Sequence, residues 1–150
     1  MKAPLSLGYS PCPNDTYSFY ALVHGHLEGA PEVREVLEDI ETLNGLAAQG
    51  VLDVVKVSFH AFGHFLSDYC LLHSGGALGR GCGPLVVARE GFVTDTLATS
   101  RVAIPGRMTT AALLLRLFAP ALTEVVEMPF HHILEATRSG EVDAGVIIHE

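Results

Sequence analysis

Apolar and polar positions along this chain follow two different periods, and the switches between them predict strands that are followed by helices. Short apolar or alternating runs bounded by Gly, Pro, Asn, Asp or Ser are typical of strands buried on one or both faces. On this pattern we expect strands at 5–9, 33–37, 53–58, 70–72, 84–88, 102–104, 123–128 and 144–148. Each run is short, which favours one strand of a sheet over a helix.

The clearest helical pattern follows the strand expected at 102–104. Its apolar residues lie at positions i, i+3, i+4 and i+7, the spacing of one buried helical face: Ala111, Leu114, Leu115 and Phe118. Thr109 or Thr110 stands where this helix begins, and its hydroxyl can cap the first N–H groups. Such an N-terminus carries partial positive charge and can hold a carboxylate. A helix cap and a ligand-binding corner both remain open as interpretations.

Weaker helical patterns follow other strands. Asn14 or Asp15 is expected to cap the first helix, and a short helix at 42–49 is expected to end at Gly50 in a left-handed conformation. A later helix is expected to close at Gly140. Two of these helices each have one face made of regularly spaced residues, Tyr17-Tyr20-Ala21-His24 and Phe130-Ile133-Leu134-Thr137, and a third helix is expected to hold Phe59, Phe62 and Leu66.

Strands that alternate with helices in this way predict an α/β fold with largely parallel sheets. The length suits one domain or two small lobes, and we expect a first lobe at 1–93 and a second at 94–150. In open sheets of this class, ligands bind at the carboxyl ends of the strands. Polar residues follow three such ends: Ser58, the pair Thr109-Thr110, and His149. We therefore expect these side chains to face one small-molecule cleft.

The charge balance narrows the choice of partner. The chain has 17 acidic residues against nine Lys and Arg, a net charge of -8, so phosphate backbones and anionic membranes are repelled. Nucleic acid and membrane surfaces are not expected as partners. An anionic ligand would have to be held by a few local donors.

The cysteines and the N-terminal stretch indicate a cytoplasmic protein. Cys12, Cys70 and Cys82 are odd in number and widely spaced, which predicts reduced thiols. Pro4 and Gly8 interrupt the apolar run that a signal peptide would need. The last predicted strand would leave an unpaired edge unless more chain or a partner covers it, and we expect the front part of a longer protein. The oligomeric state is not predicted.

Neither a phosphate-binding motif nor a metal-binding motif is recognisable. The glycine-rich stretch 73–84 matches neither GxxxxGK[ST] nor GxGxxG, and we expect a backbone crossing there. His60 and His64 have helical spacing and His131 and His132 are adjacent, but no HExxH pattern surrounds them. No metal site is expected.

Four ordered motifs carry a resemblance that covers nearly the whole chain. They are SPCPNDT at 10–16, SGGALGRGCGPLVV at 74–87, PGRMTTA at 105–111 and AGVIIHE at 144–150. In these motifs the chain resembles the 1,4-dihydroxy-6-naphthoate synthase family of menaquinone biosynthesis by the futalosine pathway. The resemblance implies a two-lobed fold like that of periplasmic binding proteins (type II). It also implies that family chains continue past the last motif to complete the second lobe.

An activity and a site follow from the same resemblance. It implies a cytoplasmic lyase that converts cyclic dehypoxanthine futalosine to 1,4-dihydroxy-6-naphthoate without metal or organic cofactor. His149 would be the proton acceptor, and Asn14 and Asn44 fall near the same cleft by analogy. The substrate, a small carboxylate, would be bound by Lys56, Val57, Ser58, Thr109 and Thr110.

Simpler interpretations stand beside these expectations. On pattern alone, His149 is a histidine without a role and Ser58 is a helix cap. Two other functions also remain open. One is the chorismate dehydratase of the same pathway, which shares the fold. The other is a non-catalytic binding protein for a small carboxylate, against which the absence of a signal sequence argues.

Overall fold

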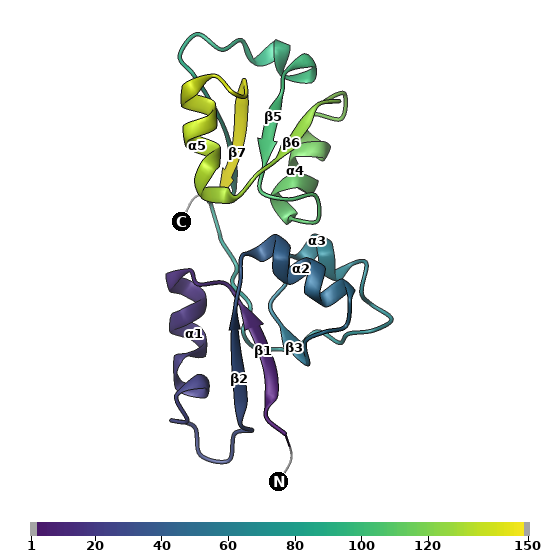
Figure 1. Ribbon diagram of the computed structural model, residues 1–150. Coiled ribbons are helices and arrows are strands. Elements are labelled where there is room, and N and C mark those ends of the chain that lie inside the picture. The colour runs from purple at the N-terminus through teal and green to yellow at the C-terminus, as the bar shows by residue number, and fades with distance from the viewer. Residues whose placement is uncertain (1–2, 149–150) are drawn as a thin grey trace. The chain divides into compact units, whose positions relative to one another are not determined.

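The computed structural model describes residues 3–148. The chain forms two compact units, Met1–Leu78 and Gly79–Glu150 (Figure 1). The second unit thus begins earlier than the boundary expected after residue 93. The cause is β4 (Pro84–Ala88), which pairs with β7 (Ala144–Ile148) and so belongs to the second unit.

In the first unit, parallel strands form a sheet in the order β2-β1-β3. The local order is the expected one, with each strand followed by a helix. The elements are β1 (Leu5–Tyr9), α1 (Pro13–Val23), β2 (Val33–Leu37), α2 (Ile40–Ala48), β3 (Val54–Val55) and α3 (Phe59–Phe62).

The two longer helices, α1 and α2, cover opposite faces of this sheet. Alternate residues of β1 point to opposite faces, so the neighbours of Tyr9 and Gly8 show which helix covers which face. Tyr9 packs against Phe19 of α1, with ring centroids 4.8 Å apart. Gly8 faces α2, where an added Cβ would lie 2.5 Å from Leu52 Cδ1 and 3.0 Å from Leu43 Cδ2. The absence of a side chain at Gly8 therefore lets this side of the unit pack closely.

Two polar contacts bind β1 to its neighbours. Ser6 donates from its N–H at 2.8 Å and from its hydroxyl at 2.6 Å to Asp53 Oδ2, and these bonds lower the pKa of Asp53. On the other side, the hydroxyl of Tyr9 donates to Glu35 of β2. Burial raises the pKa of Tyr9 above its ordinary value, and the bond to the Glu35 carboxylate adds to that rise.

The second unit has a mixed sheet in the order β4-β7-β5-β6. β4 runs antiparallel to β7, while β5, β6 and β7 are parallel to one another. Its remaining elements are η1 (Thr94–Thr99), β5 (Val102–Ile104), α4 (Thr110–Phe118), β6 (Val125–Glu127) and α5 (Phe130–Ser139).

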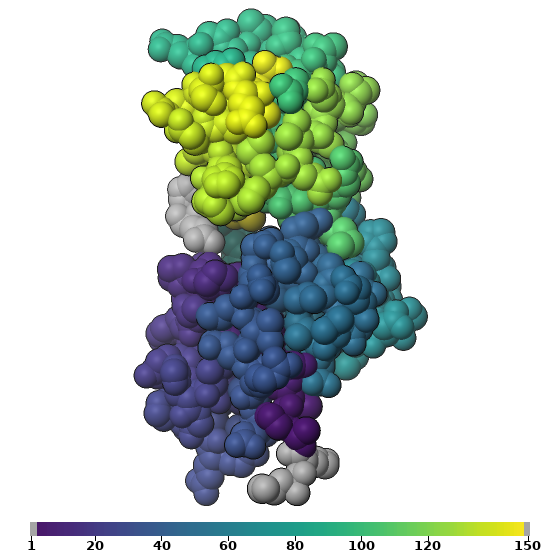
Figure 2. All heavy atoms as spheres, in the orientation of Figure 1, coloured from purple at the N-terminus to yellow at the C-terminus, as the bar shows by residue number. Residues whose placement is uncertain are grey.

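Each face of this sheet has its own helix and its own apolar core. On one face, Val102, Ile104 and Val146 pack with α4. On the opposite face, Ala103 packs with Ile133 and Ala136 of α5 and with Val142; the atoms of α5 cover the side seen in Figure 2. β7 lies between β4 and β5, so strands of this same chain pair with both of its edges.

Several local predictions are confirmed. Thr109 is the N-cap of α4. Gly50 has a φ value of 64°, the left-handed conformation expected after α2, and α5 closes at Gly140 as expected, with a φ value of 87° there. The periodic predictions of these two helices were also close to the observed bounds.

Other local predictions were wrong. Neither Asn14 nor Asp15 caps α1, which begins at Pro13 after Cys12 and has no side-chain cap. Residues 70–72 form no strand. The buried residues of α4 are Ala111, Ala112 and Leu115, whereas Leu114 and Phe118 are 43% and 69% exposed.

No helix in the range 3–148 is both long enough and apolar enough to cross a bilayer. Cys12, Cys70 and Cys82 are free thiols.

Candidate functional site

A buried carboxylate organises the carboxyl ends of β1 and β3 in the first unit. Asp15, on the first turn of α1, is 3% exposed. Its Oδ2 accepts the Ser10 hydroxyl at 2.8 Å and the Ser10 N–H at 3.3 Å. Its Oδ1 forms an ion pair with Lys56 Nζ, whose side chain is 22% exposed. Three short segments, after β1, in α1 and after β3, are thereby tied together.

The backbone of Lys56 contributes to the same arrangement. Its N–H donates to the carbonyl of Gly8 at 2.8 Å and so continues the pairing of β3 with β1. Lys56 is therefore fixed at both ends, by β1 through its backbone and by Asp15 through its ammonium group. The ammonium is engaged by a protein carboxylate, which makes Lys56 a structural support for the loop that follows it.

A second polar cluster lies on that loop. Asn44, on α2, is fully buried, and its Oδ1 accepts the Ser58 N–H at 3.0 Å. Its Nδ2 donates to Ser58 Oγ at 3.3 Å and to Glu41 Oε2 at 3.0 Å. Ser58 occupies the N-cap position of α3, but its hydroxyl makes no capping bond. The Ser58 hydroxyl accepts one bond from Asn44 and so keeps a proton to donate.

The structure brings some of the residues expected at the site in the first unit together and leaves another apart. Lys56 and Ser58 lie at one end of the sheet, with half-buried Val57 between them, and Asn44 binds Ser58 directly. Asn14 is exposed, and its carbonyl accepts the Ser18 hydroxyl at 2.8 Å. Asp15 was missed as a site residue. The signal for it was a lysine on an apolar strand, which requires a counter-charge.

In the second unit, Thr109 shapes the turn between β5 and α4. It is 2% exposed, its hydroxyl donates to the Gly106 carbonyl at 2.7 Å, and the same oxygen accepts the Ala112 N–H at 3.2 Å. Its own N–H donates to Gly106 O at 3.3 Å. The polar groups of Thr109 therefore serve the turn itself.

Thr110 occupies the first position of α4 and is half-buried. The first N–H groups of a helix have no acceptor within the helix, and they point along its axis with partial positive charge. Next to this turn, Arg107 Nε lies 2.5 Å from Glu127 Oε1, which ties the loop after β5 to the end of β6. This corner has the chemistry to hold an anionic group.

His149, the expected proton acceptor, lies outside the described residues. β7 ends at Ile148, directly before it. Elsewhere, His60 and His64 lie 5.3 Å apart between ring centroids, and His131 and His132 lie 4.1 Å apart. Between residues 3 and 148, His, Cys, Asp and Glu do not gather in threes as a metal site would require.

Comparison with solved structures defines the class of fold. The chain resembles the P235GK mutant of ArgBP from T. maritima, with a TM-score of 0.65 at 15% identity over 95% of this chain and 67% of that one. It also resembles the aliphatic sulphonate binding protein SsuA of Escherichia coli, with a TM-score of 0.59 at 15% identity over 99% and 55%. The α/β fold is that of solute-binding proteins (type II), which confirms the predicted fold class.

The chain belongs to the menaquinone biosynthesis family, whose profile matches residues 5–150. It is 50% identical to the 1,4-dihydroxy-6-naphthoate synthase of Streptomyces coelicolor and 52% identical to that of Thermus thermophilus, over 97% of this chain and 53% of each relative. The solved protein AF1704 from Archaeoglobus fulgidus matches with a TM-score of 0.90 at 40% identity. It too is covered over only 54% of its length. The chain therefore spans about half the length of these relatives.

Proposed function

We propose that a protein containing this chain is a carbon–carbon lyase of menaquinone biosynthesis, converting cyclic dehypoxanthine futalosine to 1,4-dihydroxy-6-naphthoate in the cytoplasm. The observation that carries the proposal is the identity of 50% and 52% to two proteins of that name, over 97% of the chain. Because the chain spans about half of those relatives, the activity is assigned to a protein of their full length.

In the proposed reaction, His149 removes a proton next to a carbonyl group of the substrate, after which a ring bond breaks and the bicyclic product becomes aromatic. Imidazole suits this role because its ordinary pKa, about 6.5, lies close to neutral pH. The step uses neither a metal nor an organic cofactor in this proposal. The gain in aromaticity contributes much of the driving force.

The first unit contributes a neutral hydrogen-bond donor to the proposed site. Ser58 donates its hydroxyl to an oxygen of the ring system, and Asn44, bonded to Ser58 at 3.0 Å and 3.3 Å, fixes that hydroxyl in place. The ion pair with Asp15 supports this assignment, since it leaves Lys56 to hold the loop in place. Val57, between Lys56 and Ser58, contributes its backbone and its apolar side chain to the same part of the proposed site.

The second unit contributes the anion-binding corner. In this proposal the substrate's carboxylate binds at the N-terminus of α4, where Thr110 is the first helical residue and the helix dipole places partial positive charge. Thr109 acts indirectly, because its hydroxyl and N–H already bond to Gly106. The two threonines, which the sequence could not separate, thus receive different roles.

A chimaera tests the proposal. Residues 1–150 are joined to the part of the S. coelicolor relative that has no counterpart in this chain, and the product is incubated with cyclic dehypoxanthine futalosine or with chorismate. We expect the naphthoate chromophore to appear from the first substrate, and chorismate to persist. Loss of chorismate would instead indicate the dehydratase, and tight binding without turnover would indicate a binding protein.

The role of His149 is tested in the same chimaera. His149→Ala is expected to lower kcat by about 10²–10⁴-fold while substrate affinity stays within a few-fold, because a general base acts mainly in the transition state. His132→Ala is the matched control, since His132 is an exposed histidine of the same unit. Unchanged turnover in His149→Ala would remove His149 from the mechanism.

A further inference from the structure

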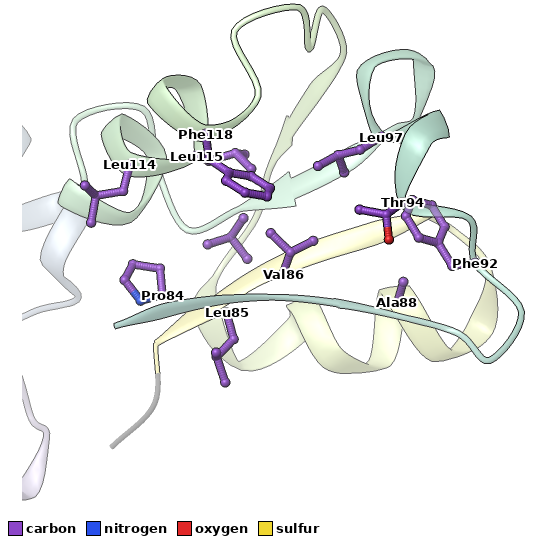
Figure 3. A pocket seen from close by; sticks show the side chains of 11 residues that line it. Pro84, Leu85, Val86, Ala88, Phe92, Thr94, Leu97, Leu114, Leu115 and Phe118 are labelled. Carbon is purple, nitrogen blue, oxygen red and sulfur yellow. The ribbon is translucent and has the colours of Figure 1, made fainter. Parts of the chain in front are cut away.

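An apolar groove lies on the second unit, and neither Thr109 nor Thr110 is among the residues that line it. Its volume is about 410 Å³. Figure 3 shows Val86 of β4 beneath the groove, with Leu115 and Phe118 of α4 along one side and Leu97 at the end formed by η1. All the residues that line it belong to this unit.

The groove exists because α4 covers only part of its sheet face. The small and buried residues of α4, Ala111 and Ala112, pack with the core around β5 and β7. β4 lies at the edge of the sheet, beyond this contact, and Val86 there is 40% exposed. Phe118 leans over the groove and is 69% exposed. Large apolar side chains therefore face one another across open space.

The chemistry of the groove does not suit the proposed substrate. Of its described lining residues, Thr94 alone has a polar side chain. Small-molecule sites of this size combine apolar walls with several placed polar groups, and a carboxylate needs donors or positive charge. Exposed apolar side chains that gather at one place often mark a protein–protein contact instead.

The length of the relatives points to the occupant. Both naphthoate synthases and AF1704 match this chain over 53–54% of their lengths, so nearly half of each has no counterpart here. We infer that this groove is the docking site for an apolar polypeptide segment from that remaining part of the family's chain, whether it is joined to residues 1–150 or supplied as a separate chain. The segment covers Val86 and inserts against Leu114 and Phe118.

The test compares two adjacent positions of α4, one that lines the groove and one that does not, in residues 1–150 alone and in the chimaera. Phe118 and Leu117 lie side by side on α4 and are both 69% exposed, but Phe118 lines the groove and Leu117 does not. Phe118→Glu and Leu117→Glu are made in residues 1–150 alone and in the chimaera with the remainder of the S. coelicolor relative. Unfolding midpoints in urea and the circular dichroism of all the proteins are measured.

In the 1–150 chain, both substitutions are expected to leave the midpoint nearly unchanged, because both side chains already face water. In the chimaera, Phe118→Glu is expected to lower the stability of the folded protein and Leu117→Glu to leave it unchanged. Leu114→Glu, a second groove substitution, should follow Phe118→Glu. As a separate chain, the remainder should bind residues 1–150 at least about tenfold more weakly after Phe118→Glu.

Three results would overturn the inference. Equal effects of Phe118→Glu and Leu117→Glu in the chimaera would show that the groove is not the contact. Concentration-dependent dimers of residues 1–150, lost on Phe118→Glu and retained in the chimaera, would show a second copy as the occupant. A chimaera indifferent to every groove substitution would leave the groove without a polypeptide partner. None of these readouts depends on turnover, so the proposed function can fail independently.

Discussion

Lys56 and Asp15, which are 41 positions apart, form an ion pair at the end of the first sheet, with the carboxylate almost fully buried. The Ser10 hydroxyl and N–H occupy the other oxygen of that carboxylate. Breaking a buried pair leaves its partner uncompensated, which costs more than the pair itself contributes. The loop that carries Ser58 therefore depends on a residue that does not touch it.

Asp15→Asn tests this dependence. Removal of one member of a buried pair costs about 3–5 kcal/mol, and because the Lys56 side chain keeps 22% exposure we expect about 2 kcal/mol. Urea unfolding measures the loss. Asp68→Asn is the matched control at an exposed carboxylate, with an expected change within about 0.5 kcal/mol. Equal midpoints for the two variants would contradict a stabilising pair.

Asn44 and Ser58 should separate stability from substrate binding. Asn44→Ala removes a fully buried amide that bonds the Ser58 N–H, so we expect a loss of about 2 kcal/mol. Ser58→Ala leaves that N–H bonded to Asn44 and should cost about 1 kcal/mol or less. In the chimaera, Ser58→Ala should weaken substrate affinity more than it weakens folding. Calorimetric titration and urea unfolding together give both quantities, and affinity unchanged by Ser58→Ala would remove it from the site.

The hydrogen bonds from Ser6 make the Asp53 contact dependent on pH. They lower the pKa of Asp53, so its contribution to stability is present above the ordinary value of an aspartate, about 3.9, and is lost as pH falls through the lower folded value. Asp53→Asn should therefore lower Tm at neutral pH and lower it less near pH 3. Ser6→Ala should weaken the same dependence. A Tm difference that stays constant from neutral to acid pH would argue against this contact.

The cap of α4 is tested by Thr109→Val, which keeps the shape of the side chain and removes the hydroxyl. We expect a loss of about 1 kcal/mol, because the Ala112 N–H and the Gly106 carbonyl both lose their partner. Thr109→Ser keeps the oxygen and should retain most of the stability. If Thr109→Ser and Thr109→Val unfold at the same urea concentration, the hydroxyl is not the stabilising group.

Gly145 of β7 lets α5 pack closely on the sheet. An added Cβ would lie 2.4 Å from Ile133 Cγ2 and 2.9 Å from Thr137 Oγ1, both on stiff β-branched side chains in the core. Gly145→Ala should cost about 1–3 kcal/mol through overpacking. Gly45→Ala, in open space on α2, should instead raise stability by about 0.5–1 kcal/mol. The opposite signs are read from thermal unfolding, and a neutral Gly145→Ala would show that α5 can shift.

Local patterns predicted the succession of strands and helices well. Five strands have the predicted bounds, since each is a short apolar or alternating run ended by turn residues: 5–9, 33–37, 84–88, 102–104 and 144–148. The predicted strand at 70–72 failed because an apolar run becomes a strand only when a neighbour offers hydrogen bonds. On α4, periodicity identified a wide apolar stripe. It could not tell that the sheet covers Ala112 and leaves Leu114 and Phe118 exposed.

The candidate site residues were selected by the rule that places ligands at the carboxyl ends of strands. Ser58 and Thr109 do follow strands, and Asn44 bonds to Ser58. The rule gave no access to Asp15, because a contact over 41 positions leaves no periodic trace, and local capping preference assigned it to a helix end. Nor could it show that the polar groups of Thr109 are used within its own turn.

The position of β7 inside its sheet also governs how the second unit can form. Val86 and Val146 are register partners although 60 positions separate them, and β5 needs the same strand on its other side. Strands that are far apart in the sequence can pair only after a long loop has closed, and the entropy cost of closing that loop slows folding. During synthesis, the residues of β4 leave the ribosome well before their neighbour exists. We therefore expect the second unit to fold late and cooperatively, because β4 has no strand to pair with until β7 has been synthesised.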